Sequence, residues 1–360
     1  MKLSFNIRED LGEYEPSDNE AQLIDKIIEA NDTMLPRGSG DERYKPGMRA
    51  QHPKAHATVE GTFEVLDLSD KESWAQVGLF GQTGTYPVKA RFSNSASFED
   101  NPEKGDAHGL AIRIEGPADI IRERKFVDAG SENSIDFVLM DNETFFEGDL
   151  EKYARINDLA AEVVNNKRNS KDWLASKINA LKLALEVKFF DRDLGNAIEG
   201  SKDQFPDSPL TTAYFSTTPY LLGEHAVKYE LRPYDVSEPA PQHPKKTDDY
   251  LSRQLFKGLS AKHQIFGFYV KRQQSRSKHP IEDPTIPWDG AEEILIARLK
   301  LSKIGVAKFE DWRQPTLDGE NVGYNIWNTI QEHRPLGAIN RARGIVYVAL
   351  QKKRHELSLE

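Results

Sequence analysis

Two stretches of the chain, residues 52–138 and 226–301, are dominated by short runs in which apolar and polar residues alternate. Alternation with a period of two predicts strands with one buried face, and Gly, Pro, Asn or Asp beside the runs predicts turns. Strands without long helices between them favour an antiparallel sheet or barrel over a parallel α/β fold. The predicted strands include residues 59–65, 88–92, 110–114, 226–231, 264–270 and 294–301.

Apolar residues at helical spacing predict a short amphipathic helix over residues 20–30 and helical regions over residues 148–200 and 328–355. In the second region, an apolar stripe from Trp173 to Val187 indicates a buried helix face. The proline-rich segment 237–244 predicts a surface loop.

The order of these elements is sheet, then helices, then sheet and helix again. This order predicts one α+β domain over residues 48–355. The preceding residues 1–47 are expected to form an N-terminal arm that carries the short helix.

Composition and charge narrow the possible functions. The chain has 360 residues, a net charge of -10 and no cysteine. Its acidity argues against a general nucleic-acid binder, which needs a basic face. Without cysteine there are no disulfides, thiolate nucleophiles or iron–sulfur clusters, so a metal must be held by His, carboxylate or Tyr, or arrive inside a cofactor.

The chain also lacks the signals of a membrane or secreted protein. No apolar run approaches the roughly 18 residues of a membrane span. The N-terminal residues turn acidic at once and do not resemble a signal peptide. We therefore expect a cytoplasmic protein.

Arg343 and Tyr347 form the only Arg-x-x-x-Tyr pattern in the chain. On a helix the two side chains would lie one turn apart on the same face. A guanidinium beside a phenol favours the phenolate, and a phenolate is a known axial ligand of haem iron. The pair therefore indicates either a haem-iron site or, more simply, an amphipathic helix with a half-buried tyrosine.

Upstream residues offer chemistry that suits a ligand site. His52 and His56 precede the first predicted strand, and an imidazole there could act as an acid–base group beside Arg49, which could bind a carboxylate. Ser93 could orient a histidine ring, and Gly109 would allow a flat ligand to approach closely. The alternative readings are a solvated basic loop, a turn residue and a bulge.

Two further segments have both a functional and a plain interpretation. Segment 136–146 passes a polar elbow and ends in Phe145-Phe146, which could wall a ligand or fill the core. The run from His333 to Arg343 contains four basic side chains, which would suit haem propionates or an exposed helix face.

Taken together and in this order, these motifs resemble the catalase superfamily, most of all its short bacterial haem proteins of the minicatalase or allene-oxide-synthase-like branch. The family carries Arg-x-x-His-Ala-Lys, Val-Arg-Phe-Ser, Asp-x-x-Gly-x-Ala, Asp-Leu-Val followed by Phe-Phe, and Arg-x-x-x-Tyr. The corresponding segments here are residues 49–54, 90–93, 106–111, 136–146 and 343–347. The run at 333–341 is typical of the short members.

The resemblance implies an antiparallel β-barrel of about eight strands with surrounding helices, a b-type haem, and a peroxide or lipid hydroperoxide as substrate. It assigns Tyr347 as the iron ligand and Arg343 as its charge partner. The remaining roles that it implies are His52 as distal base, Ser93 as the partner of its other ring nitrogen, Arg49 and Arg91 at the propionates, Gly109 beside the haem, Phe145 as an apolar wall and Tyr153 as a stacking aromatic.

The resemblance leaves several alternatives open. The stretch between the distal histidine and Phe63 is one residue longer than in large catalases, so His56 competes with His52. The distal amide of the family falls near Asp141, with Asn142 adjacent. The activity is expected to be that of a catalase or peroxidase; alternatives are a fatty-acid hydroperoxide rearrangement or lyase enzyme, a haem protein with little turnover, and a barrel without haem. The short arm favours a homo-oligomer smaller than the tetramers of large catalases.

Overall fold

The structure of the chain, a computed structural model, describes residues 6–37, 47–68, 72–95, 106–116, 133–169, 206–234, 247–317 and 322–359. The predicted apolar stripe from Trp173 to Val187 and the predicted loop at 237–244 lie outside the described residues.

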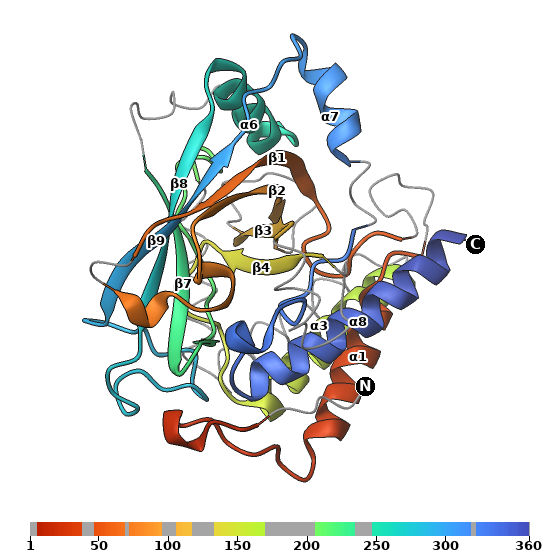
Figure 1. The fold of residues 1–360 in the computed structure, drawn as a ribbon. Helices are drawn as coiled ribbons and strands as arrows, with labels where there is room; N and C mark the ends of the chain where they lie inside the picture. Colours follow the sequence, from red (N-terminus) through yellow and green to blue (C-terminus); the bar gives the residue numbers. More distant parts are fainter. Residues whose placement is uncertain are drawn as a thin grey trace.

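Within the described residues, nine strands form one antiparallel sheet in the order β5-β4-β3-β2-β1-β9-β8-β7-β6. Because β5 also pairs with β7, eight of these strands close into a barrel (Figure 1). The ninth strand, β6, pairs with the beginning of β7, on the edge whose far end pairs with β5. The predicted antiparallel barrel and all six predicted strands are confirmed. The strands are β1 (Ala55–Val65), β2 (Gly84–Asn94), β3 (His108–Ile114), β4 (Ile135–Met140), β5 (Tyr214–Phe215), β6 (Tyr220–Leu222), β7 (His225–Pro233), β8 (Gln264–Arg272) and β9 (Glu292–Leu301).

Aromatic side chains fill the inside of the barrel. The ring of Phe268 on β8 lies 5.2 Å from that of Phe63 on β1 and 5.1 Å from that of Phe137 on β4, centroid to centroid. These three strands are not neighbours in the sheet, so the contacts cross the barrel interior. An eight-stranded barrel is just wide enough for its own side chains to fill. The barrel centre is therefore a packed core, and a ligand has to bind beside it.

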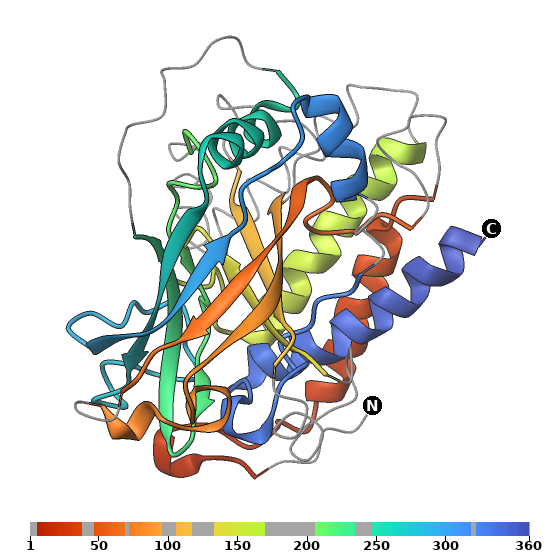
Figure 2. The same cartoon turned by 45° about the horizontal axis from the view of Figure 1, so that its top comes forward.

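Three helices lie side by side along one flank of the barrel, as both views show (Figures 1 and 2). They are α1 (Glu20–Met34), α3 (Leu150–Asn169) and α8 (Ala338–Leu359). The predicted helix at residues 20–30 is thus confirmed as part of α1. Apolar residues from all three helices share one buried cluster, among them Ile27, Tyr153 and Val346. Burial of such a stripe is what holds helices of this length in place.

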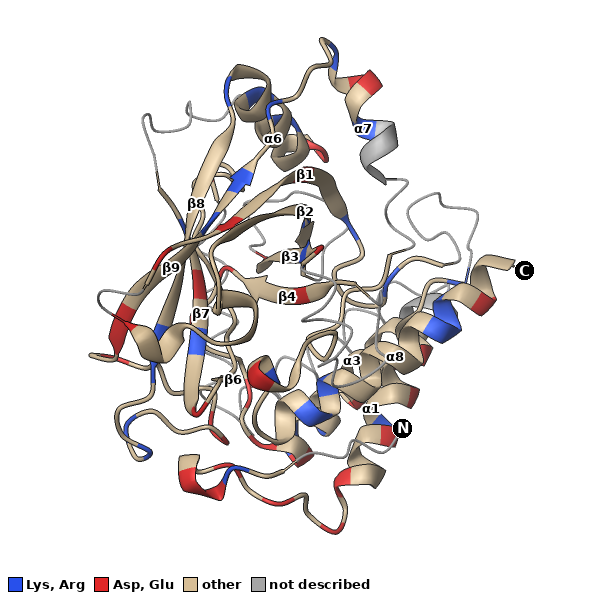
Figure 3. Ribbon diagram, viewed as in Figure 1, with Lys and Arg blue, Asp and Glu red and all other residues tan. Residues whose placement is uncertain are grey.

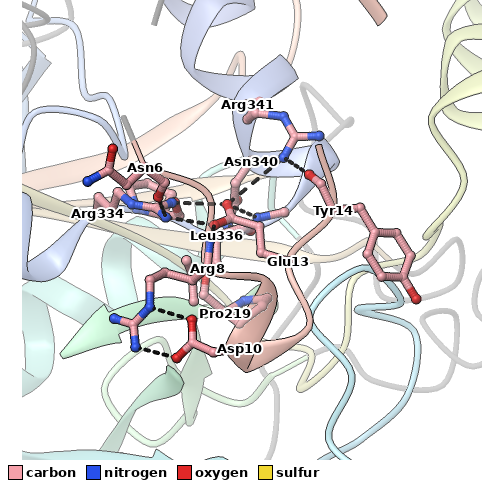
Figure 4. A network of polar contacts seen from close by, with 12 residues as sticks. Asn6, Arg8, Asp10, Glu13, Tyr14, Pro219, Arg334, Leu336, Asn340 and Arg341 are labelled. Carbon is pink, nitrogen blue, oxygen red and sulfur yellow. Dashed lines mark hydrogen bonds and ion pairs between the residues drawn. The ribbon is translucent and has the colours of Figure 1, made fainter. Parts of the chain in front are cut away.

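Buried ion pairs fasten the N-terminal arm to the first turn of α8 and to the segment just before it (Figure 4). Both carboxylate oxygens of Glu13 accept hydrogen bonds from Arg334, at 3.0 and 2.6 Å, and both side chains are 0% exposed. Arg341 donates to both oxygens of Glu20, at 2.8 and 2.7 Å. Two such bidentate pairs fix the position of the arm relative to α8.

The end of the chain differs from the sequence prediction. α8 begins at Ala338 instead of near residue 328. The preceding residues form a short 3-10 turn at Gln331–His333 and a bend at Gly337, whose φ is 87°. A proline and a left-handed glycine are incompatible with a continuous helix here. Two further helices, α6 (Tyr250–Ala261) and α7 (Phe309–Leu317), were not predicted from the sequence.

Residues of both charges occur throughout the described part of the chain. In Figure 3, lysines and arginines of the described residues are interspersed with aspartates and glutamates on both strands and helices. Among the described helices, none has the length and apolar character to cross a bilayer.

Candidate functional site

A cavity with an empty volume of about 890 Å³, its open mouth included, lies between the barrel wall and helices α1, α3 and α8. Strands β2, β3 and β4 supply the wall on the barrel side. Its lining combines apolar side chains with several polar and charged ones, which is typical of a ligand site. Residues that line it and were named from the sequence are Arg49, His52, Arg91, Ser93, Gly109, Tyr153 and Tyr347.

His52 is held on the barrel wall by both its backbone and its ring. Its φ is 53°, a conformation that is uncommon for residues other than glycine. The backbone N–H donates to the carbonyl of Ser95 at 2.7 Å, and ring atom Nδ1 lies 3.1 Å from Oγ of Ser93. Withdrawal from water and the charges of Arg91 and Arg49 lower the pKa of His52 to about 3. The ring is therefore neutral at neutral pH and able to accept a proton.

Gly109 leaves the space that the ring of His52 occupies. A Cβ at this position would lie 2.7 Å from both Cε1 and Nδ1 of His52. Gly109 pairs with Ser93 across β2 and β3, so the ring is held by two adjacent strands. A close approach to the backbone was expected at Gly109. In the structure it is the ring of His52 that approaches Gly109 closely, and a ligand in the cavity could do so as well.

Two arginines line the cavity close to His52. Arg91 on β2 donates through Nη2 to the carbonyl of His52 at 2.9 Å. Arg49 donates through Nη2 to the carbonyl of Val322 at 2.5 Å. A guanidinium carries five N–H donors in a fork that matches the two oxygens of a carboxylate.

Tyr347 lines the opposite wall, on α8. Nε of Arg343 donates to its phenol oxygen at 3.2 Å, from one helical turn before it. Nη1 of Arg343 donates to Thr218 at 2.9 Å and to Asn340 at 3.1 Å, which fixes the guanidinium against the phenol. Burial acts to lower the pKa of Arg343, but the phenols of Tyr347 and Tyr220 raise it above its usual value, so the group stays charged.

Tyr153 and Phe145 both lie near Arg343, but only Tyr153 lines the cavity. Burial raises the pKa of Tyr153 to about 12, so its phenol is neutral. The ring of Phe145 stacks on Phe146 at 4.5 Å and lies 5.4 Å below the guanidinium of Arg343. Phe145 is thus part of the packing behind Arg343 and is not among the residues that line the cavity.

The alternative distal residues lie away from the cavity. His56 is buried in β1, and burial together with His108 and Lys54 lowers its pKa well below the usual value. Asp141 accepts two hydrogen bonds from His108, one from its backbone N–H and one at Nδ1, both at 2.7 Å. Asn142 is exposed. None of these three lines the cavity, and β4 contributes the apolar Val138 and Leu139 instead.

Several residues that line the cavity were not predicted from the sequence. Arg354 follows Tyr347 by seven residues, which places it on the same face of α8, and its Nε donates to the carbonyl of Gly47 at 2.8 Å. This helical spacing was a signal that could have been used. Gln51 directly precedes His52, whereas Asn31 comes from the N-terminal arm and Tyr324 from the segment before α8. No local pattern distinguishes these last two.

The basic run before Tyr347 has a different use from the one expected. Arg334 and Arg341 bind Glu13 and Glu20 of the arm and are buried. They therefore do not face the cavity, and of the basic residues in this run only Arg343 contacts the candidate iron ligand.

Segment 323–328 packs behind α8 and positions it against the barrel. The side chain of Asn325 donates to the carbonyl of Gly344 at 3.1 Å, and Nε1 of Trp327 donates to the carbonyl of Asn340 at 2.7 Å. A Cβ on Gly344 would lie 2.1 Å from Cδ1 of Trp327. The indole therefore contacts the helix backbone next to Arg343.

Comparison with known proteins identifies the fold. No protein-family model matches the chain, and no curated protein matches it in sequence. Among solved structures, a fungal catalase matches 96% of the chain with 15% identity and a TM-score of 0.57, and a bacterial catalase matches 98% with 17% identity and a TM-score of 0.59. Catalase A from Saccharomyces cerevisiae matches 98% with 16% identity and a TM-score of 0.57.

The fold is therefore catalase-like: a closed antiparallel barrel with helices on its flank. The chain spans 64%, 67% and 68% of the lengths of these three catalases. At such low identity the likeness concerns the fold, so activity and cofactor have to be argued from the residues of this chain.

Proposed function

We propose that the chain binds b-type haem in the cavity, with Tyr347 as the axial ligand of the iron, and that it processes peroxides. The observation that supports this proposal most strongly is the pairing of two walls across one cavity. One wall carries a neutral histidine and the other a phenol that accepts a hydrogen bond from a buried guanidinium. Assignment to the short, minicatalase-like branch of the catalase superfamily is part of the same proposal.

The residues around the cavity suit the two chemical halves of a haem. Leu110, Ala111, Val138, Leu139, Val346 and Leu350 provide apolar surface for a flat macrocycle. Three arginines that also line the cavity, Arg49, Arg91 and Arg354, suit its two carboxylates. Apolar walls with a few convergent polar groups are typical of cofactor sites.

Tyr347 and Arg343 would set the charge at the iron. A phenolate ligand is negative, and Arg343 stabilises that form because it is positively charged and donates a hydrogen bond to the phenol oxygen. Bound haem would supply the metal at which an oxygen–oxygen bond is broken. Thr218 and Asn340 hold Arg343 in place, so the ligand strength depends on these neighbours too.

His52 would move the proton. Its Nδ1 is held by Ser93, which leaves Nε2 to take a proton from one peroxide oxygen and to return it to the other. A charged imidazole could not accept that proton, and the low pKa of His52 keeps the ring neutral.

Absorption spectra of the purified, haem-reconstituted protein test the ligand assignment. We expect a ferric high-spin haem spectrum that is lost or altered in Tyr347→Phe. Tyr324→Phe is the matched control, because Tyr324 lines the same cavity and is predicted not to bind iron. An unchanged spectrum in Tyr347→Phe would refute the assignment. If the wild-type protein shows no haem band, the remaining interpretation is a catalase-like barrel that has lost haem.

A second function, rearrangement or cleavage of fatty-acid hydroperoxides, is favoured by one observation. Asp141 is committed to His108, and β4 presents the apolar Val138 and Leu139 to the cavity. This wall therefore lacks an amide donor for hydrogen peroxide and could accommodate an acyl chain. Oxygen evolution from hydrogen peroxide, compared with turnover of a lipid hydroperoxide, distinguishes the two activities. Little turnover of either substrate would indicate a haem-binding protein instead.

A further inference from the structure

A network of three side-chain amides adjoins His52. Gln51, the residue before it, lines the cavity and is exposed there. Its Nε2 donates to Oδ1 of Asn31 at 3.0 Å and lies 3.4 Å from Oδ1 of Asn157. Asn31 on α1 and Asn157 on α3 are 1% and 3% exposed. Two buried residues from different helices therefore hold one cavity residue from the loop before β1.

Backbone carbonyls decide which way each amide points. Nδ2 of Asn31 donates to the carbonyl of Ile27 at 2.9 Å, and Nδ2 of Asn157 donates to the carbonyl of Tyr153 at 2.8 Å. A carbonyl only accepts hydrogen bonds, so the nitrogens of both asparagines must face these carbonyls. Nδ2 of Asn31 also donates to Oδ1 of Asn157 at 2.8 Å.

The same logic fixes Gln51. Both asparagine oxygens are acceptors, so the atom of Gln51 that meets them must be its donor, Nε2. The other polar atom of the side chain is the carbonyl oxygen, which only accepts hydrogen bonds. The network uses the donor of Gln51 and leaves its carbonyl oxygen as the polar atom available to a ligand of the cavity that Gln51 and His52 both line.

We propose that Gln51 is a specificity-determining residue that selects hydrogen peroxide over alkyl hydroperoxides, an inference that rests on the proposed peroxide function. Hydrogen peroxide carries two O–H groups, and an alkyl hydroperoxide carries one. His52 accepts the first. The carbonyl oxygen of Gln51 accepts the second, which an alkyl hydroperoxide does not have. A site built to hydrogen-bond a substrate hydroxyl discriminates against the analogue that lacks it.

The N-terminal arm is therefore part of the selection. Asn31 belongs to α1, and its buried side chain links α1 to α3 through Asn157. Nε2 of Gln51 would lose one of its two acceptors if either asparagine were replaced. The side chain of Gln51 could then rotate, and its carbonyl oxygen would no longer be held in one direction. Specificity would then weaken without any change in the residues that contact the substrate.

Steady-state kinetics of the haem-reconstituted protein test the proposal with Gln51→Leu, which is close to glutamine in size and has no acceptor. We expect kcat/KM for hydrogen peroxide to fall about tenfold, mainly through KM, and kcat/KM for cumene hydroperoxide to stay within about twofold. Asn157→Leu should give a smaller change in the same direction. Gln351→Leu removes an amide from the Tyr347 wall and should leave the ratio of the two substrates unchanged. Equal changes for both substrates in Gln51→Leu would overturn the proposal.

A measurement on the protein before haem addition tests the network itself. In the ¹⁵N spectrum, the side-chain amide of Gln51, identified by its loss in Gln51→Leu, should exchange slowly with water and shift in Asn157→Leu. A freely exchanging amide would contradict the fixed orientation. If wild-type protein binds haem but Gln51→Leu leaves the substrate ratio unchanged, only this inference fails. If wild-type protein binds no haem, the proposed function itself fails.

Discussion

The two walls of the cavity are built in different ways. On α8, Arg343 reaches Tyr347 four residues later and Asn340 three residues earlier, so one stretch of helix assembles most of the arrangement. On the barrel wall, His52 depends on Ser93 from β2 and on the empty space above Gly109 of β3. The first wall is a product of helical spacing and the second of strand pairing. Mutations should therefore act locally on the first and through neighbouring strands on the second.

The largest effect should come from the histidine of the barrel wall. We expect His52→Leu to lower peroxide turnover about 10²–10⁴-fold, because a positioned general base contributes about that much. His56→Leu is the matched comparison, since His56 is buried in β1 and does not line the cavity. Its turnover should stay close to wild type. Steady-state assays on haem-reconstituted protein measure both, and a greater loss in His56→Leu would reverse the assignment.

The helix wall is expected to depend on the arm that fastens it. Glu13→Gln leaves the buried Arg334 without its charged partner, so we expect a loss of about 3–5 kcal/mol in the free energy of unfolding. Asp10→Asn provides the control, because Asp10 forms an exposed pair with Arg8 and should cost less than about 1 kcal/mol. Urea unfolding measures both values. Similar losses in the two variants would show that the buried Glu13–Arg334 pair contributes no more to the free energy of unfolding than the exposed Arg8–Asp10 pair.

A smaller effect tests the space above Gly109. In Gly109→Ala the added methyl displaces the ring of His52, and we expect turnover to fall about ten- to a hundredfold while the haem spectrum persists. Gly305→Ala is a suitable control, since nothing lies within 4 Å of the added Cβ. Retention of full activity in Gly109→Ala would mean that the position of the ring is not critical.

The smallest effect concerns acid stability. Burial lowers the pKa of His333, just before α8, to about 3. In the unfolded chain a histidine titrates near 6.5, so the unfolded state takes up this proton first as the pH falls. The stabilising contribution is therefore complete above about pH 6.5 and is lost progressively towards pH 3.

This contribution should amount to about 1 kcal/mol between pH 7 and pH 5.5. Nε2 of His333 accepts a hydrogen bond from the backbone of Leu79, so His333→Gln can keep an acceptor there without titrating. Urea unfolding at the two pH values should show a smaller pH dependence in the variant. His52 has the same low pKa but faces the cavity, so solvent should reduce its share. An identical pH dependence in His333→Gln and wild type would exclude this role for His333.

Sequence reasoning was effective where the physics is local. Alternation predicted the strands, and four-residue spacing on a helix predicted that Arg343 and Tyr347 would be adjacent. It was less effective where a position depends on distant parts of the chain. Asp141 adjoins His108 because β3 and β4 pair there, and Arg334 and Arg341 find Glu13 and Glu20 more than 300 residues away. Charge alone suggested haem propionates or an exposed helix face for these two arginines, whereas tertiary packing gave them buried carboxylate partners.

Gly344 has a consequence for attempts to engineer this protein. A glycine in the middle of a helix is about 1 kcal/mol less favourable than alanine, so it is an obvious target for stabilisation by design. Here the indole of Trp327 occupies the place of the missing methyl, beside Arg343, which donates a hydrogen bond to the phenol of Tyr347. Replacement by alanine would push the helix and the indole apart. A library built on helix propensity alone would select against the geometry on which Tyr347 depends.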